Sequence, residues 1–331
     1  MTPPLISVIV VNLNTCGLLR SCLASVMEDR EGVEKEIIVI DNGSSDDSVE
    51  MIHRDFPSVV LQENSRNQRF AKPNNDGMRI ARGEYFFFLN SDAVIARGTL
   101  ASLAGFLEAH PDAGACGPRL EYPDGRLQRS VSKYHSPWTH FCDMLFLDSL
   151  FPRTVLFAGG EMMHCPYDES KTQQVESLMG AAFMVRRAVI ENTGMFDEEL
   201  TVFYNEMDWF RRMDNSGWGV YYAPVATVVH HRGVTSENMN RDFGYLDEMY
   251  YNVFYYFHKH YGYIGLAFYR FWLIVGFLLR WILWKAQSMF ESSRVKSSHF
   301  EYVNRVLKIA VRFWIPIKQY RPSMSGAEKD S

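Results

Sequence analysis

The sequence has few cysteines and no positively charged leader. Its 331 residues contain five cysteines, with no C-x-x-C pair among them: Cys16, Cys22, Cys116, Cys142 and Cys165. This odd and scattered set argues against a disulfide framework and a zinc site, and it favours a reducing compartment. The opening Met1-Thr2-Pro3-Pro4 has no basic residue, so we expect no secretory signal.

Long uncharged hydrophobic runs are also scarce. Residues 263–284 are almost wholly apolar or aromatic, but Arg270 and Arg280 interrupt them and leave only residues 271–279 uncharged. A bilayer span needs about 20 apolar residues. The segment therefore falls short of a span unless both arginines reach the headgroups.

Acidic residues are rare in the C-terminal part, although the whole chain has a net charge of −5. Between residues 270 and 321 the only acidic residues are Glu291 and Glu301. Residues 300–315 place apolar side chains, including Val311 and Trp314, on one helical face and basic ones on another. This pattern favours a helix lying in a headgroup layer, and the alternative is a helical hairpin packed on the rest of the protein. Basic residues alternate with apolar ones and no recognition module is present, which disfavours nucleic-acid binding.

The first hundred residues alternate β-branched runs with segments of helical spacing. We expect strands over residues 6–11, 37–40, 59–61 and 85–89, and helices over residues 16–27, 48–56 and 72–81. Strands joined through helices need right-handed crossovers, so the sheet should be mostly parallel with helices on its faces. Its ligand-binding edge then holds Asn12, Asp41 and Asp92 together.

The pattern changes twice more along the chain. Residues 99–240 mix helices, over 100–110 and 206–216, with strands over 113–118, 178–185 and 219–229. Residues 134–176 show little periodicity, and a stretch of that length is more often a functional lid than a connector. We expect an α/β domain over residues 1–240, with halves 1–98 and 99–240, followed by a helical region over residues 241–331.

Candidate chemistry begins at two strand ends. Asp41 follows one buried strand and Asp92 follows another. Each motif alone is also an ordinary turn or polar strand end. Their expected position on one sheet edge indicates a crevice for a nucleotide and a metal ion.

A third cluster lies near a helix start. Glu206 or Asp208 there could accept a proton from a substrate hydroxyl, although acidic groups are favoured at this position by the helix dipole alone. His230 and His231 end a strand, and a histidine there could add a nitrogen ligand to a divalent ion.

Taken in order, these motifs resemble glycosyltransferase family 2, which has the GT-A fold, and within it the rhamnosyltransferase-like branch of bacterial surface-polysaccharide assembly. Residues 6–14 and 38–46 are similar to the family's nucleotide-binding segments, residues 67–77 to its N-x-G-F-A and N-N-x-G stretch, and residues 89–92 to its D-x-D motif. Residues 180–187 and 194–198 resemble the acceptor-side segments, and residues 205–212 the segment that supplies the base. The colinear match covers roughly residues 5–235.

The resemblance implies a role for particular residues. The expected nucleotide contacts are Asn12, Asn14, Asp41, Asn67, Arg69, Asn74 and Ser91. The expected ligands of a Mg²⁺ or Mn²⁺ ion are Asp92 and His230, and the expected acceptor-side residues are Gly180, Ala181 and Arg212. The base is Glu206 or Asp208.

Three positions depart from the family's pattern. Arg69 stands where the family has glycine, and Asn90-Ser91-Asp92 keeps one carboxylate of the D-x-D motif. Asn205-Glu206 replaces a Glu-Asp pair, which places the longer Glu206 where the family's base aspartate would stand.

The resemblance implies an inverting glycosyltransferase that moves one sugar from a dTDP- or UDP-sugar to a hydroxyl of a glycan or lipid-linked glycan. It would be cytoplasmic and peripherally associated with the inner face of the membrane. The Q-x-x-R-W segment of chain-polymerising members is not found. Two alternatives stay open: a catalytically silent nucleotide-sugar-binding relative, and a sugar-1-phosphate nucleotidyltransferase, which should have a glycine-rich basic loop at residues 12–16.

Overall fold

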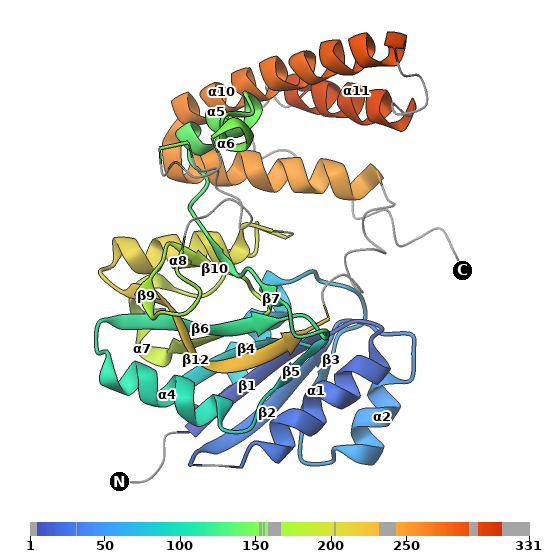
Figure 1. Cartoon of the computed structure of the whole chain (residues 1–331). Coiled ribbons are helices and arrows are strands. Elements are labelled where there is room, and N and C mark those ends of the chain that lie inside the picture. Colours follow the sequence, from blue (N-terminus) through green and yellow to red (C-terminus); the bar gives the residue numbers. More distant parts are fainter. Residues whose placement is uncertain are drawn as a thin grey trace. The chain divides into compact units, whose positions relative to one another are not determined.

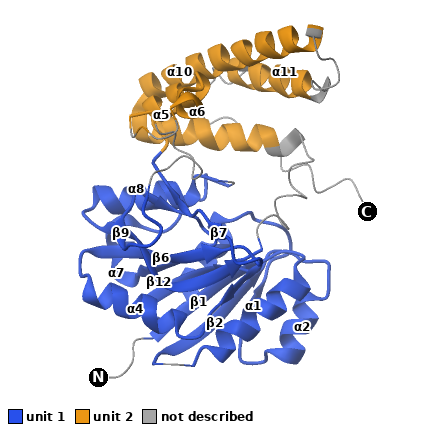
Figure 2. Cartoon of the chain, viewed as in Figure 1, with its two compact units in different colours: residues 1–134, 167–241 blue, residues 135–166, 242–331 orange. Residues whose placement is uncertain are grey.

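The computed structural model of the chain describes residues 5–30, 32–151, 154, 156–157, 167–201, 203–231, 243–290 and 297–312 (Figure 1). Two compact units divide the chain (Figure 2): unit 1 comprises residues 1–134 and 167–241, and unit 2 comprises residues 135–166 and 242–331. The second boundary lies close to the expected one at residue 240. Residues 135–166, expected inside the N-terminal domain, instead belong to unit 2.

Unit 1 has the following helices and strands in chain order. They are β1 (Leu5–Asn12), α1 (Cys16–Glu28), β2 (Glu34–Asp41), α2 (Ser48–Asp55), β3 (Val60–Glu63), α3 (Ala71–Ile80), β4 (Tyr85–Asn90), β5 (Ala93–Ile95), α4 (Thr99–Ala109), β6 (Ala113–Glu121), β7 (Leu127–Gln128), β8 (Val131–Ser132), β9 (Gln173–Gln174), β10 (Ser177–Leu178), β11 (Ala182–Arg186), α7 (Arg187–Thr193), α8 (Asn205–Asn215) and β12 (Gly219–His230).

The main sheet runs in the order β3-β2-β1-β4-β11-β6-β12-β5. Its first four strands are parallel, as expected from their crossovers. The other half is mixed, because β11 is antiparallel to both β4 and β6, and β12 is parallel to β6 but antiparallel to β5. The expectation of a mostly parallel sheet therefore holds for the N-terminal half alone.

Helices cover both faces of the sheet (Figure 1). On one face, Val8 and Val10 belong to one buried cluster with side chains of α1, α2 and α4. On the other face, α3 lies so close to β1 that a Cβ on Gly77 would come within 2.7 Å of Ile9. Phe88 on the same face contacts Trp209 of α8 with ring centroids 5.7 Å apart. Helices therefore pack against β4 from both faces of the sheet, which fixes the position of its carboxyl end.

The expected strand over residues 178–185 is interrupted. Strand β10 ends at Leu178 and pairs with β8, whereas β11 begins at Ala182 in the main sheet. Residues 179–181 therefore leave the regular ladder next to the end of β4. Gly180 lies in this break.

Unit 2 is helical in its described part. It contains α5 (Pro137–Met144), α6 (Leu147–Leu150), α10 (Phe243–Phe290) and α11 (Ser297–Arg312). Gly262, with φ 65°, breaks α10 into two helices. The buried face of α11 differs from the predicted apolar face. Val306 and Ile309 are buried, whereas Val311, which was predicted on the apolar face, is 60% exposed. Trp314 lies outside the described residues.

Residues 134–176, predicted to form a lid, contain α5 and α6, and residues 158–166 lie outside the described part of the chain. Ser136 caps α5, since its Oγ accepts the Thr139 N–H at 3.1 Å, and Pro137 occupies the first turn. This cap shows why a helix forms in a stretch without clear periodicity.

Candidate active site

The carboxyl ends of β1, β2 and β4 form one polar network. Asn12 lies opposite Asp41 in the sheet, and its Nδ2 donates to Asp41 Oδ1 at 3.0 Å. Thr15 Oγ1 lies 2.6 Å from Asn12 Oδ1 and 2.9 Å from Ser91 Oγ. The structure therefore brings three expected nucleotide-site residues together and links them through Thr15.

Backbone donors hold the Asp41 carboxylate in the turn after β2. Its Oδ2 accepts from the Ser44 N–H at 2.8 Å, and its Oδ1 accepts from the Ser44 hydroxyl at 2.6 Å. Asn14, in the left-handed region with φ 53°, accepts the Ser45 N–H at 2.7 Å. Asparagine tolerates this backbone conformation better than most residues. The loops after β1 and β2 are thus bound to each other before any ligand arrives.

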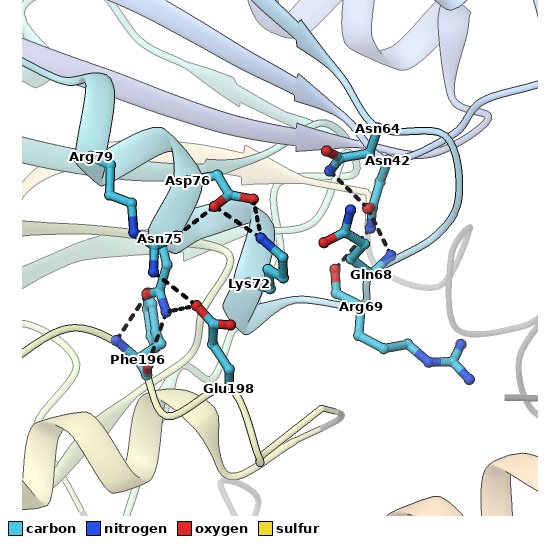
Figure 3. A network of polar contacts seen from close by, with 10 residues as sticks. All are labelled: Asn42, Asn64, Gln68, Arg69, Lys72, Asn75, Asp76, Arg79, Phe196 and Glu198. Atoms are coloured by element: carbon cyan, nitrogen blue, oxygen red, sulfur yellow. Dashed lines mark hydrogen bonds and ion pairs between the residues drawn. The ribbon is translucent and has the colours of Figure 1, made fainter. Parts of the chain in front are cut away.

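The loop over residues 67–69 is held to the end of β2 by Asn42 (Figure 3). Asn42 Nδ2 donates to Asn67 Oδ1 and to the Arg69 carbonyl, each at 2.9 Å. The Arg69 N–H donates back to Asn67 Oδ1 at 2.8 Å. The Asn67 amide is therefore used to shape this loop.

Arg69, at the position where the family pattern has glycine, takes a backbone conformation that favours glycine. Its φ is 66°, in the left-handed region, where a non-glycine residue costs about 1 kcal/mol. Its guanidinium extends away from the polar network in Figure 3. Arg69 thus places a cation beside the loop over residues 67–69, which was expected to contact a nucleotide.

Residues of α3 connect the nucleotide side to the turn before α8. Asn74 Nδ2 donates to the Phe70 carbonyl at 2.9 Å, so this expected nucleotide contact supports the start of α3. Asn75 donates to the Phe196 carbonyl and accepts its N–H, both at 3.0 Å (Figure 3). The acceptor-side segment 194–198 is thereby fixed to α3.

Asp92 and His230, the expected metal ligands, lie side by side. His230 Nε2 is 3.2 Å from Asp92 Oδ1, and both side chains are buried. The other ring nitrogen, Nδ1, lies 2.8 Å from Oε1 of Gln128 on β7. A proton on Nδ1 would be donated to this oxygen, which leaves Nε2 as an acceptor with the Asn90 amide Nδ2 at 3.4 Å and the Asp92 carboxylate Oδ1 at 3.2 Å.

Two acceptors facing each other need a cation or a second proton between them. Adjacent oxygen and nitrogen ligands of an octahedral Mg²⁺ or Mn²⁺ lie about 3 Å apart, which the Asp92–His230 separation of 3.2 Å fits. Within the described residues, no group of three or more His, Cys, Asp or Glu could hold a metal. These two side chains would therefore hold the ion together with oxygen atoms from a ligand and water.

Glu206 approaches the same sheet edge from α8. A Cβ on Gly180 would lie 2.8 Å from Glu206 Cδ and closer still to Oε1, so any larger residue there would displace the Glu206 carboxylate. The next residue, Ala181, accepts the Asn90 N–H at 2.9 Å. The candidate base thus lies against Gly180, the residue before the one that bonds to Asn90 at the end of β4.

Burial sets the acidity of Glu206. Loss of solvent raises the pKa of this carboxyl from 4.5 to about 7. The two residues before α8, Phe203 and Tyr204, both have positive φ, of 55° and 61°. Such strain persists only where surrounding contacts impose it, and here it directs the start of α8 toward Gly180.

Asp208, the other candidate base, is paired with Arg212. The Arg212 Nε donates to Asp208 Oδ2 at 2.9 Å, and Asp208 is fully buried. The same guanidinium donates to the Thr193 carbonyl and, at 2.8 Å, to the Met195 carbonyl. Asp208 and Arg212 therefore brace α8 against the 193–195 turn, and the geometry favours Glu206 as the base.

Two residues of the site were missed from the sequence. Thr15 joins Asn12 to Ser91, and Gln128 orients His230. Thr15 had a detectable signal, since it directly follows the motif at residues 12–14. Gln128 had none, because it belongs to a two-residue strand far from His230 in the sequence.

Comparison with known proteins gives the same family as the motifs. The family model described as glycosyl transferase family 2 matches residues 7–192. The N-acetylglucosaminyl-diphospho-decaprenol L-rhamnosyltransferase of Mycobacterium tuberculosis is 24% identical over 207 residues, which are 59% of this chain and 66% of that protein. Protein y4gI of Sinorhizobium fredii is 26% identical over 240 residues, 70% of this chain and 25% of that protein. The chain thus spans less than two thirds of either relative.

Solved structures with the same fold include two that extend over most of the chain. TarS 1-349 of S. aureus has a TM-score of 0.51 and 16% identity, covering 94% of this chain and 81% of that one. The mannosyltransferase PcManGT of Pyrobaculum calidifontis, in complex with GDP-Man and Mn²⁺, has a TM-score of 0.51 and 16% identity, covering 94% and 87%. At this identity they support the GT-A fold and no more.

Proposed function

This chain belongs to glycosyl transferase family 2, and we propose that it transfers one sugar, with inversion, from a nucleotide-diphospho-sugar to a hydroxyl of a glycan or lipid-linked glycan. The proposal is carried by one observation. Glu206 packs on Gly180, and the next residue, Ala181, bonds to Asn90 at the end of β4. Asp92 of the Asp92–His230 pair follows Asn90 by two residues, so the candidate base and this pair lie at the same edge of the sheet.

Each side chain has a defined task in this proposal. The Asn12–Asp41–Ser91 network positions the nucleotide, while Asp92 and His230 would hold Mg²⁺ or Mn²⁺. When bound, the ion would neutralise charge on the leaving diphosphate. Glu206 takes the proton from the acceptor hydroxyl as its oxygen forms a bond to the anomeric carbon. The bond from that carbon to the diphosphate breaks, and the diphosphate keeps the electron pair.

The donor and acceptor classes rest on the relatives. The M. tuberculosis relative is by name a rhamnosyltransferase acting on a decaprenyl-diphosphate-linked sugar, which supports a lipid-linked acceptor here. The dTDP- or UDP-sugar donor is what the resemblance of the motifs implies. Such an acceptor stays in the membrane. An enzyme on the cytoplasmic face would then meet it by diffusion in two dimensions.

The experiment that tests this proposal begins with a thermal-shift panel of nucleotide-sugars, with and without Mn²⁺. The donor that stabilises the protein is then used to compare wild type with Glu206→Gln, which keeps shape but removes the base. We expect transfer to fall by about two to four orders of magnitude, with the donor dissociation constant unchanged.

Glu108→Gln is a matched control, since that side chain is exposed at the C-terminal end of α4, just before the start of β6. It should retain transfer. Near-normal transfer by Glu206→Gln would assign the base to another group, with Asp208 the next candidate. Donor binding without donor hydrolysis or transfer in the wild type would favour a silent nucleotide-sugar-binding relative.

A further inference from the structure

Two arginines on the second half of α10 have opposite surroundings. Arg280 is satisfied by α5 and its own helix: it donates to the carbonyls of Asp143 at 3.2 Å, Met144 at 3.1 Å and Gly276 at 3.3 Å. Its Nη2 also lies 3.7 Å from Asp143 Oδ1. A cation at the C-terminal end of α5 complements the helix dipole. Arg280 is therefore a structural residue of unit 2.

Arg270, ten residues earlier, is buried without such partners. It is 7% exposed, and neither Nε nor Nη2 has a hydrogen-bond partner. Its guanidinium lies over the Phe254 ring, 4.6 Å from the centroid. Burial lowers the pKa of Arg270 to about 10, so it stays charged at neutral pH. A buried cation in this state destabilises the protein until an anion pairs with it.

The surroundings of Arg270 supply no anion from the described residues. Its neighbours on the same buried stripe of α10 are apolar, namely Leu266, Leu273 and Phe277. No carboxylate contributes to the shift in its pKa. Nε and Nη2 together form the edge of a guanidinium that binds two oxygens of one phosphate or carboxylate group. Among the described residues, these two donor atoms therefore have no oxyanion to bind.

The outer face of the same helix is apolar and exposed. Large apolar side chains are exposed there at helical spacing: Ile264, Phe268, Phe271, Leu278 and Ile282. The helix is also long and apolar enough to cross a membrane, with a mean hydropathy of 1.7 in a window of which a third is buried. Water is a poor solvent for such a face, and lipid is a good one.

We propose that Arg270 binds the phosphate group of a membrane lipid, with the exposed apolar stripe of α10 in the lipid layer. Arg270 belongs to unit 2, whereas the residues of the candidate active site belong to unit 1. The lipid phosphate would supply the two acceptors that Nε and Nη2 lack. Loss of this site would leave the glycosyl-transfer proposal intact, because the tests below measure binding and stability.

Thermal melting of the full chain in a neutral, phosphate-free detergent tests whether Arg270 is unpaired. Arg270→Met keeps much of the volume and removes the buried charge, so it should raise the melting temperature. Arg280→Met should lower it, because the α5 carbonyls lose their donors. A fall in melting temperature for both variants would show that Arg270 is paired within the protein, and would overturn the proposal.

Sedimentation with vesicles tests the ligand. Neutral galactolipid vesicles are compared with the same vesicles containing phosphatidic acid. We expect Arg270→Met to bind the phosphatidic-acid vesicles about 100-fold more weakly than wild type, from the loss of two charge-assisted hydrogen bonds. Lys285→Met removes an exposed charge from the same helix and should weaken binding by about fivefold.

Two results would contradict the proposal. One is equal weakening by Arg270→Met and Lys285→Met, which would assign vesicle binding to general charge. The other is stabilisation of wild type by inorganic phosphate, lost in Arg270→Met, with no difference between the variants on vesicles. That outcome would make Arg270 a site for soluble phosphate.

Discussion

Two regions of the candidate site in unit 1 are held by different forces: the proposed nucleotide side, around Asn12 and Asp41, and the proposed base side, around Glu206. On the nucleotide side, Asn12, Asp41, Thr15 and Ser91 are joined by hydrogen bonds that form without any ligand. On the base side, Glu206 is placed by close packing on Gly180, and burial dominates its pKa. The nucleotide side should therefore tolerate a small change in shape, whereas the base side should not.

Gly180→Ala tests the packing that positions Glu206, and of the substitutions below we expect it to lower the transfer rate most. The added Cβ would lie 2.8 Å from Glu206 Cδ, so the carboxylate has to move. A displacement of about 1 Å costs roughly 100-fold in rate, and we expect that loss in kcat with donor binding retained. The measurement is transfer with the donor found in the thermal-shift panel.

Gly105→Ala in α4 is the control for this substitution. A Cβ there meets nothing within 4 Å, and alanine favours the helix more than glycine does. It should keep full activity. Equal activity in the two variants would mean that close packing on Gly180 does not position Glu206.

Gln128→Leu tests the hydrogen bond that orients His230, the proposed metal ligand. It removes the Oε1 acceptor 2.8 Å from His230 Nδ1, and losing such a partner lowers metal affinity by about tenfold or more. Mn²⁺ affinity, measured by electron paramagnetic resonance of free Mn²⁺, should fall accordingly. Stability should change little, because Gln128 Nε2 is itself buried without a partner.

Gln128→Glu restores an acceptor for the same proton, and it should restore most of the Mn²⁺ affinity. If both variants lost affinity equally, the role of Gln128 would be packing. If neither lost affinity, His230 would not be a metal ligand.

Arg69→Gly should have the smallest effect. Glycine relieves the left-handed strain at φ 66° but increases the entropy of the unfolded chain, and each contribution is about 1 kcal/mol. Stability should stay nearly constant, while the donor dissociation constant rises by about fivefold through loss of one cation near the diphosphate. Isothermal titration with the donor measures this change, and unchanged affinity would remove Arg69 from the nucleotide site.

The sequence predicted the nucleotide side better than the base side, for a physical reason. Parallel strands with β-branched runs align their carboxyl ends, so Asn12, Asp41 and Asp92 could be placed together. The contact between Gly180 and Glu206 depends on a break in a strand that looked continuous over residues 178–185. No periodic signal marks such a break.

Contacts between segments far apart in the chain could not be predicted from the sequence either. Gln128 meets His230 through a two-residue strand, and the assignment of residues 135–166 to unit 2 depends on packing of α5 against α10. The structure also separates Glu206 from Asp208, because Arg212 pairs with Asp208. The sequence had favoured Glu206 as the base from its position in the family motif, with Asp208 as the next candidate.

The pH dependence of transfer tests the central claim most directly. With a pKa of about 7, raised from 4.5 by burial, Glu206 is mostly protonated below pH 7 and ionised above it. The same shift removes stability as pH rises through about 7, since the folded state holds this proton more tightly than the unfolded state does. We predict that kcat of the wild type rises with pH around a midpoint near 7, and that Glu206→Gln is slow and lacks this step. An identical step in both proteins would contradict the account.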